Sequence, residues 1–200
     1  MTKHPRTHIP DFEPLGHIYM ASDGMILPSV TTILKEELGL YSWGSSSAAT
    51  RGTHVHLACQ YYDEGNLDEA TVRPEIHPYL AQYKLALQEH GITVLQNELR
   101  RYSPKYLFAG SIDKVVEISG RRAILDIKTG SKEHWHRWQT AGYKELMAPE
   151  LGQSVDRYDL YLSPDDSELV QHQGKRDFGE FMAFLSTYTI KGNTGYRKTK

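Results

Sequence analysis

GSIDKVVEISGRRAILDIKTG, residues 110–130, contains two runs rich in Ile, Val and Leu on either side of the segment SGRR. Apolar runs around a glycine-containing turn predict an antiparallel β-hairpin that bends at Gly120. The runs also carry charge, because Asp113 lies in the first, and Asp126 and Lys128 lie in the second. Aspartate is depleted in strands, so these charged residues call for a physical explanation.

The length of the turn determines which charged residues face each other. With the two-residue loop Ser119-Gly120, Asp113 lies opposite Asp126, whereas with a four-residue loop, 119–122, it faces Lys128. Either loop puts the three charged side chains on one face, because strand side chains alternate. Facing side chains begin about 4.5–5.5 Å apart at Cβ. Two carboxylates at that separation repel unless a positive charge lies between them.

Two interpretations of this face follow from the residues alone. In the first, the acids lie on a solvated face of the sheet and Lys128 pairs with one of them. In the second, they bind a divalent cation, because hard oxygen ligands on rigid strands suit Mg²⁺ or Mn²⁺. Lys128 beside the metal would then orient a water nucleophile or stabilise charge that develops on a phosphate.

The rest of the chain predicts further elements from helical spacing, capping residues and alternation. Residues 1–25 are expected to form an N-terminal arm or an edge hairpin, and Pro149 is expected to end a helix. The segment MILPSVTTIL is predicted to lead from a short extended stretch into a helix, with Ser29, Thr31 or Thr32 as its N-cap. Further helices are predicted at residues 46–62, 74–90, 132–147 and 176–191. The predicted strands cover residues 92–103, 105–119, 121–130, 154–163 and 168–173.

This order predicts the fold class: an α/β domain with a mixed central sheet flanked by helices. A chain of 200 residues is most simply one domain, 1–200, with a flexible basic tail at 192–200. The apolar fraction of 39% and the charged fraction of 24% are typical of a soluble globular protein. A single cysteine, Cys59, excludes an internal disulfide and a thiolate metal cluster.

Composition also bears on location and partners. No apolar run is long enough for a membrane helix, and the N-terminus lacks the apolar segment of a signal peptide. We therefore expect a cytoplasmic protein with no membrane partner. The net charge of −2 neither indicates nor excludes nucleic-acid binding, which needs only a local basic surface. Basic residues do gather at 100–105, 121–122, 128–137 and 197–200.

The charged hairpin resembles a known core. GSID followed by LDIKTG is similar to the PD-(D/E)XK nucleases, with Asp113 as the first acid and residues 126–128 as the (D/E)-X-K triplet. QTAGY, residues 139–143, resembles the Q-x-x-x-Y signature of the RecB-like branch. RGTHVH, residues 51–56, resembles the G-x-x-x-H helix start of the same branch, with His56 at the histidine position. LPSVTTIL and ELRRYSPKYLFAGSID are similar to phage-type members.

The resemblance implies a fold of the restriction-endonuclease type and a metal site. One or two Mg²⁺ or Mn²⁺ ions would be held by His56, Asp113, Asp126 and the carbonyl of Ile127. The imidazole would favour Mn²⁺, because nitrogen suits the softer ion. Since the chain lacks a cysteine cluster, the iron–sulfur subgroup of these nucleases is excluded.

The resemblance also assigns roles to further residues. Glu98 is expected to be a catalytic acid that reaches the metal through water. The expected catalytic set is Asp113, Asp126, Lys128 and Glu98, and the expected substrate-binding set is Gln139, Tyr143, Arg51 and Lys132.

Ordinary structural roles stand beside these assignments. His56 is one of ten histidines, Glu98 could be an exposed strand residue, and Tyr143 could be core packing. His54 is about 200° around the helix from His56 and should face elsewhere. The segment HWHRW, residues 134–138, is interpreted as aromatic stacking or helix packing rather than as a metal site.

The implied activity is that of a metal-dependent deoxyribonuclease, and specifically an exonuclease in phage-type recombination or DNA end processing. Its substrate would be single-stranded DNA or duplex ends, in the host cytoplasm of a phage or prophage, with a recombination protein as a candidate partner. Two alternatives remain open: a structure-selective endonuclease on the same core, and a DNA-binding module without catalysis. The complete acid–acid–lysine set favours an enzyme over the binding module.

Overall fold

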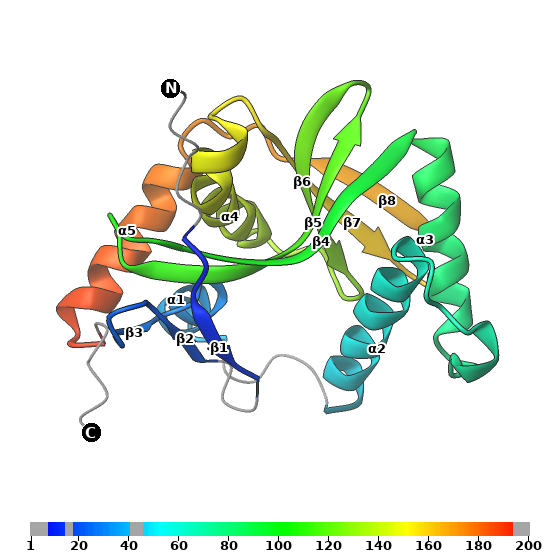
Figure 1. The fold of residues 1–200 in the computed structure, drawn as a ribbon, viewed down its shortest axis with the longest axis horizontal. Coiled ribbons are helices and arrows are strands. Elements are labelled where there is room, and N and C mark those ends of the chain that lie inside the picture. Colours follow the sequence, from blue (N-terminus) through cyan, green and yellow to red (C-terminus); the bar gives the residue numbers. More distant parts are fainter. Residues whose placement is uncertain (1–7, 15–17, 41–45, 194–200) are drawn as a thin grey trace.

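The structure is a computed structural model that describes residues 8–14, 18–40 and 46–193 (Figure 1). A five-stranded sheet in the order β4-β5-β6-β7-β8 forms its centre. β6 and β7 run parallel, and the other neighbours run antiparallel. The mixed sheet predicted from the sequence is therefore confirmed. The strands are β4 (Ile92–Ser103), β5 (Phe108–Ile118), β6 (Arg121–Lys128), β7 (Asp156–Leu162) and β8 (Ser167–Gln171).

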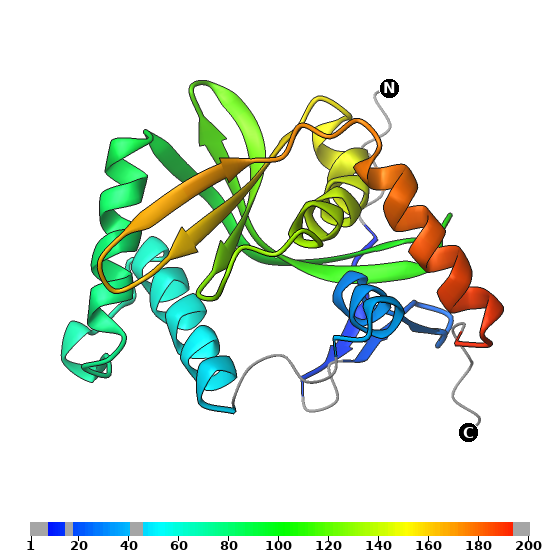
Figure 2. The same cartoon turned by 180° about the vertical axis from the view of Figure 1, so that it is seen from behind.

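Helices cover both faces of the sheet (Figures 1 and 2). One face carries α4, with α1 and α5 packed beside it, and the other carries α3 and α2. The helices are α1 (Val30–Leu38), α2 (Ser46–Asp63), α3 (His77–Glu89), α4 (His136–Leu151) and α5 (Asp177–Ile190), with a short 3₁₀ turn η1 (Glu69–Thr71). None of the described helices is both long and apolar enough to cross a membrane.

The hydrophobic core is divided by the sheet into two layers. Successive residues of β6 point to opposite faces, so Ile124 packs under α4 while Leu125 packs under α3. Both side chains are fully buried, as expected for a central strand covered on two sides. Polar side chains on the α4 face of this strand are therefore held in a largely dry environment.

The central hairpin has the two-residue loop. Lys114 pairs with Leu125 and Ile118 pairs with Arg121, which leaves only Ser119 and Gly120 in the turn. Both turn residues have positive φ, 51° and 73°, as a type I′ turn requires. This register places Asp113 opposite Asp126.

The strand before the hairpin is irregular where it passes the acids. The pairing of β4 with β5 shifts between Val94 and Gln96, a β-bulge. Further along, Glu98 has φ of 48°, an uncommon conformation for a residue with a side chain. Its neighbours Asn97 and Leu99 pair with Lys114 and Ile112, so Glu98 stands across from Asp113.

Most predicted elements are present with shifted ends. Ser29 is the cap of α1, because its hydroxyl accepts the Thr32 backbone N–H at 3.0 Å. The expectation that Pro149 ends α4 is wrong, since the helix runs on to Leu151. A proline this near the C-terminus removes one backbone donor of the last turn, and the Gly152 N–H still bonds the Ala148 carbonyl.

Part of the region predicted to be an arm or an edge hairpin forms a small three-stranded sheet, separate from the central sheet. It consists of β1 (Asp11–Glu13) and β2 (Ile18–Met20), which pair antiparallel, and β3 (Ile26–Leu27) beside them. The remainder of the predicted arm, residues 1–7 and 15–17, and residues 194–200 of the predicted tail lie outside the described residues.

Candidate metal centre and active site

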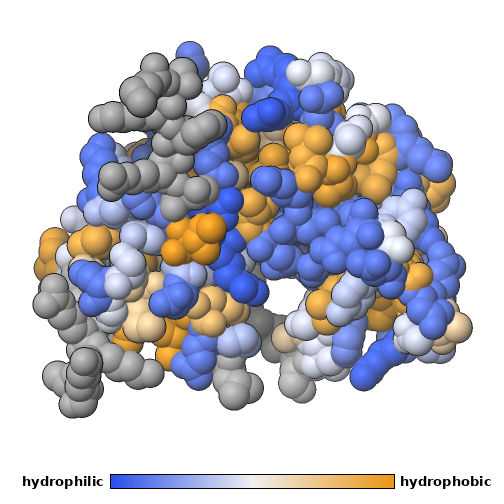
Figure 3. Space-filling view, in the orientation of Figure 1, coloured by the Kyte–Doolittle hydropathy of each residue, from blue (hydrophilic) through white to orange (hydrophobic). Residues whose placement is uncertain are grey.

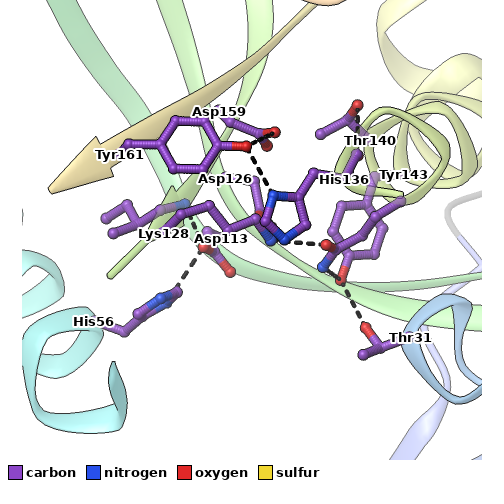
Figure 4. Close-up of polar contacts among 12 residues, drawn as sticks. Thr31, His56, Asp113, Asp126, Lys128, His136, Thr140, Tyr143, Asp159 and Tyr161 are labelled. Carbon is purple, nitrogen blue, oxygen red and sulfur yellow. Dashed lines mark hydrogen bonds and ion pairs between the residues drawn. The ribbon is translucent and has the colours of Figure 1, made fainter. Parts of the chain in front are cut away.

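Three side chains from three elements meet beside the central hairpin. His56 comes from α2, Glu98 from β4 and Asp113 from β5, and one ligand atom of each lies within 4.8 Å of the others. The Nδ1 atom of His56 is 3.2 Å from Oδ2 of Asp113 (Figure 4). All three side chains are half-buried. An imidazole and two carboxylates form a donor set that suits Mn²⁺ or Mg²⁺.

Two contacts hold α2 so that His56 reaches the site. Near its start, a Cβ at Gly52 would lie 3.3 Å from the Thr129 hydroxyl, so glycine permits close approach to the end of β6. At its last residue, Asp63 pairs with the Lys114 ammonium at 2.5 Å, and both side chains are only 3% exposed. Because Lys114 follows Asp113 in β5, this buried pair ties α2 to the strand that carries the first acid.

Asp113 also completes the backbone hydrogen bonds of the hairpin. The pairing of β5 with β6 ends at Lys114 and Leu125, and beyond it Oδ2 of Asp113 accepts the Ile127 backbone N–H at 2.8 Å. The same oxygen faces His56. One carboxylate therefore bonds to the β6 backbone and belongs to the candidate ligand group.

Glu98 carries a carboxyl group whose charge is disfavoured. Burial raises its pKa to about 7, and the nearby negative charge of Asp113 adds to the rise. A bound cation would act in the opposite direction, because it stabilises the ionised carboxylate. The unusual backbone at Glu98 thus holds a carboxyl group where burial and Asp113 outweigh the positive charges of Lys114 and Arg100.

Lys128 is held by α4 through a chain of hydrogen bonds. Its ammonium donates to Oε1 of Gln139 at 2.7 Å, and Nε2 of Gln139 donates to the Tyr143 hydroxyl at 3.0 Å. The Tyr143 hydroxyl in turn lies 3.4 Å from the Thr31 hydroxyl of α1 (Figure 4). Gln139 and Tyr143 lie one turn apart on the same helix face, so the two side chains form one support behind the lysine.

The glycine of the GSID segment makes this support fit. A Cβ at Gly110 would lie 2.8 Å from a ring carbon of Tyr143, closer than any side chain can approach. The ring of Tyr143 therefore lies directly on the β5 backbone. The GSID segment and the QTAGY segment, which are about thirty residues apart in sequence, are thus in direct packing contact.

The charges around Lys128 are unbalanced. Asp126 is buried and forms an ion pair with Lys128. Burial raises the pKa of Asp126, and Asp113 adds to the rise. Burial by itself would lower the pKa of Lys128, but Asp126 and Asp159 outweigh it and the pKa is raised. Three carboxylates act on this ammonium, so negative charge exceeds positive charge around Lys128: Asp113, Asp126 and Asp159.

The predicted ligands differ in how they are placed. Glu98, expected to act through water, is itself in the three-residue group, while Asp126 lies outside that group and contacts Lys128. The metal-binding role of the Ile127 carbonyl stays a prediction. His56 and Asp113 lie together in the three-residue group, and their role as metal ligands stays a prediction.

The residues expected to contact substrate fall into two kinds. Gln139 and Tyr143 are buried, 6% and 5% exposed, and contact Lys128 and each other rather than solvent. Arg51 lies on α2 with its guanidinium 5.8 Å from the Tyr79 ring, and Lys132 forms an ion pair with Glu168. Substrate contacts by these residues stay predictions.

The sequence interpretation missed a second group of polar residues beside Lys128. The residue Asp159 on β7 is fully buried and bonds to His172 and Tyr161, and Tyr161 bonds to His136. A signal was present, because Asp159 interrupts the apolar run YDLYL as Asp126 interrupts ILDIK. His136 belongs to HWHRW, and its burial against β7 agrees with the interpretation of that segment as helix packing.

Comparison with known proteins gives a likeness in fold. No protein-family model matches the chain, and no curated protein matches it. A solved structure from Eubacterium rectale, with a provisional assignment as an exonuclease, aligns over 82% of this chain and 73% of its own. The TM-score is 0.52 at 12% sequence identity. The two chains share a fold.

A second solved structure is LHK-Exo, an alkaline exonuclease from Laribacter hongkongensis, in complex with dAMP. It aligns over 82% of this chain and 87% of its own, with 14% identity and a TM-score of 0.39.

Proposed function

We propose that this protein is a divalent-metal-dependent DNA nuclease that hydrolyses phosphodiester bonds as an exonuclease. The observation that carries the proposal is the geometry around the hairpin. Three potential ligand atoms from His56, Glu98 and Asp113 lie within 4.8 Å of one another, beside a lysine that is held by Gln139. The resemblance in sequence motifs and the shared fold support the same proposal.

The residues present fit a bound Mg²⁺ or Mn²⁺. His56, Glu98 and Asp113 would hold the ion, with Asp126 and the Ile127 carbonyl as further ligands implied by the resemblance. A bound ion lowers the pKa of a coordinated water and offsets negative charge on the scissile phosphate. Asp113, Asp126 and Asp159 all act on the one Lys128 ammonium, and this excess of negative charge favours such an ion.

Lys128 supplies a fixed positive charge for the reaction. Its hydrogen bond to Gln139 and its ion pair with Asp126 restrain the ammonium. A cation held before the reaction stabilises negative charge that develops on a phosphate without further reorganisation. Lys128 would orient the attacking water or stabilise the transition state, and Gln139 and Tyr143 position it.

The approach of DNA is proposed from the surface. Figure 3 shows a hollow between the part of the molecule that carries α1 and the part that carries α2. His56 on α2 and Thr31 on α1 lie on opposite sides of the site (Figure 4). Arg51 and Lys132 would contact backbone phosphates there. A role in phage-type recombination or DNA end processing, in the cytoplasm, is proposed on the sequence resemblance.

Three DNA substrates test this function directly. Linear duplex, closed circular duplex and single-stranded DNA are incubated with Mn²⁺, Mg²⁺ or EDTA. We expect loss of linear DNA with Mn²⁺ or Mg²⁺, intact circles, and no reaction in EDTA. Lys128→Met protein, purified in parallel, is the control for contaminating nucleases. Cleavage of closed circles would indicate an endonuclease, and retention of all DNA with a mobility shift would indicate a binding module.

A further inference from the structure

A third carboxylate lies beside Lys128 on the neighbouring strand. β6 and β7 pair in parallel with Asp126 next to Asp159 and Lys128 next to Tyr161. Paired residues of neighbouring strands point to the same face. Asp159 therefore lies on the face that carries the candidate active site, with none of its surface exposed (Figure 4).

Hydrogen-bond donors converge on one oxygen of Asp159. His172 lies with Nε2 2.6 Å from Oδ2, and the Tyr161 hydroxyl donates to the same atom at 3.2 Å. The Nδ1 atom of His136 lies 2.7 Å from that hydroxyl. Because Tyr161 has given its one proton to Asp159, His136 must be the donor in this last contact. The chain of donors is thus directed toward the carboxylate.

The chain keeps His136 uncharged. Burial lowers the pKa of His136 to about 3, and the positive charge of Lys128 lowers it further. A neutral His136 offers no counter-charge to Asp159, and the His172 imidazole, 2.6 Å from Oδ2, offers one only when it is protonated. A permanent positive charge for this carboxylate must therefore come from another group.

The second oxygen of Asp159 supplies the decisive observation. Oδ1 is buried and has no hydrogen-bond partner among the described residues. Lys128 has three N–H donors, of which one bonds to Gln139 and one faces Asp126. Asp159 is also among the charges that act most strongly on the Lys128 ammonium. A buried acceptor and a buried donor with unused capacity therefore lie in the same part of the site.

We infer that Asp159 is a second counter-ion for Lys128, a positioning residue that holds the ammonium when Asp126 is engaged by a bound cation. The inference rests on the proposed function, which asks Asp126 to serve both the cation and the lysine. One carboxylate cannot neutralise both fully. Asp159 lies outside the candidate ligand group, so its charge stays available to Lys128.

A double-mutant cycle in metal-free protein tests the pairing without any activity. The variants are Asp159→Asn, Lys128→Met and the two combined, compared by thermal unfolding with EDTA present. Removing one partner of a buried pair leaves the other uncompensated. We expect Asp159→Asn to lower the unfolding midpoint by about 4 °C or more in the presence of Lys128. In the Lys128→Met background the same change should lower the midpoint clearly less, because only the contacts with His172 and Tyr161 are then affected.

Asp156→Asn is the matched control for this cycle. It lies on the same strand, and Asp156 pairs with Arg121 at the surface. Its effect should be the same with and without Lys128. If Asp159→Asn and Lys128→Met also gave additive shifts, Asp159 would not be a partner of Lys128 and the inference would be wrong.

Kinetics then separate positioning from a purely structural role. Asp159→Asn should lower kcat about tenfold to a hundredfold, with KM and Mn²⁺ affinity near those of the unaltered protein. Asp159→Glu, which retains the charge, should recover part of the loss. An unchanged kcat in Asp159→Asn would overturn the functional part of the inference. If the unaltered protein cleaves no DNA, the proposed function fails, whereas the cycle still reports whether Asp159 and Lys128 interact.

Discussion

The Lys128 ammonium and the Gln139 side-chain oxygen lie 2.7 Å apart, so the helix that follows the central hairpin holds its lysine directly. Replacing Gln139 by Ala removes the acceptor and lets a buried ammonium move. We expect kcat for DNA cleavage to fall about tenfold to a hundredfold, because misplacing a fixed charge weakens transition-state stabilisation. Single-turnover cleavage of end-labelled linear DNA measures the effect.

Tyr143→Phe is the control for that prediction. It removes the hydroxyl that supports Gln139 from behind and leaves the Gln139–Lys128 contact in place. Its kcat should be reduced less than that of Gln139→Ala. A larger loss in Tyr143→Phe would contradict the view that Gln139 acts on Lys128 directly.

Removal of the central charges should abolish cleavage. Asp126→Ala and Lys128→Ala each remove a member of the buried ion pair at the centre of the site. We expect metal-dependent DNA cleavage to disappear in both, while circular dichroism shows retained secondary structure. Undiminished cleavage in both variants would mean that the chemistry occurs elsewhere.

His56 should contribute to metal affinity. His56→Ala removes the nitrogen ligand from the candidate group, and we expect Mn²⁺ binding to weaken about 10- to 100-fold in calorimetric titration. The effect should be smaller with Mg²⁺, which prefers oxygen ligands. The matched control is His54→Ala on the same helix. Equal Mn²⁺ affinity in the two variants would remove His56 from the ligand set.

The raised pKa of Glu98 predicts that the stability of the metal-free protein depends on pH. Its pKa is about 7 in the folded chain and 4.5 as an ordinary glutamate, so the folded state binds the proton more tightly. The contribution of Glu98 is therefore complete below about pH 4.5, and the free energy of unfolding falls as pH rises to about 7. The fall in the free energy of unfolding is on the order of 1–2 kcal/mol after allowance for the partial exposure of Glu98.

Urea unfolding across this pH range measures the fall. Glu98→Gln has no proton to lose and should flatten the profile relative to the unaltered protein. Saturating Mn²⁺ should have a similar effect, because the cation stabilises the ionised carboxylate. Parallel profiles for the variant and the unaltered protein would show that Glu98 is not the titrating group.

The ion pair between Asp63 and Lys114 should matter for stability. Asp63→Asn leaves the Lys114 charge buried, and we expect the free energy of unfolding to fall by about 3 kcal/mol. The double variant Asp63→Leu/Lys114→Met should lose less than Asp63→Asn alone, because no charge is then left unpaired. Equal or greater loss in the double variant would show that the pair stabilises beyond its charge balance.

Much of the fold followed from local patterns. The apolar alternation of the hairpin, the cap at Ser29 and the turn at Gly120 each reflect interactions between residues close in sequence. Helix ends were less predictable, as at Pro149, because a proline in the last turn costs little when Gly152 completes the end of the helix.

Residues of the candidate site that belong to sequence motifs could be named from the sequence. Residues that only the tertiary structure brings to the site could not. Motif positions named both His56 and Asp113, and the structure brings their side chains to 3.2 Å. Glu98 lies beside His56 and Asp113 at a point where its own backbone has a positive φ, and no sequence pattern predicted that conformation. Asp159 required knowledge that β7 pairs in parallel with β6, since only that register brings it beside Asp126.

The turn at Ser119 and Gly120 fixes the register of β5 and β6, which the hydrophobic core alone does not determine. If β6 slipped by two residues against β5, every side chain would keep its face, and the apolar layers would be filled almost as well. Asp113 would then meet Lys128 instead of Asp126, and the charged site would be scrambled inside a protein that still folds. The two-residue turn, in which both residues have positive φ, therefore helps to fix the register that places Asp113 opposite Asp126.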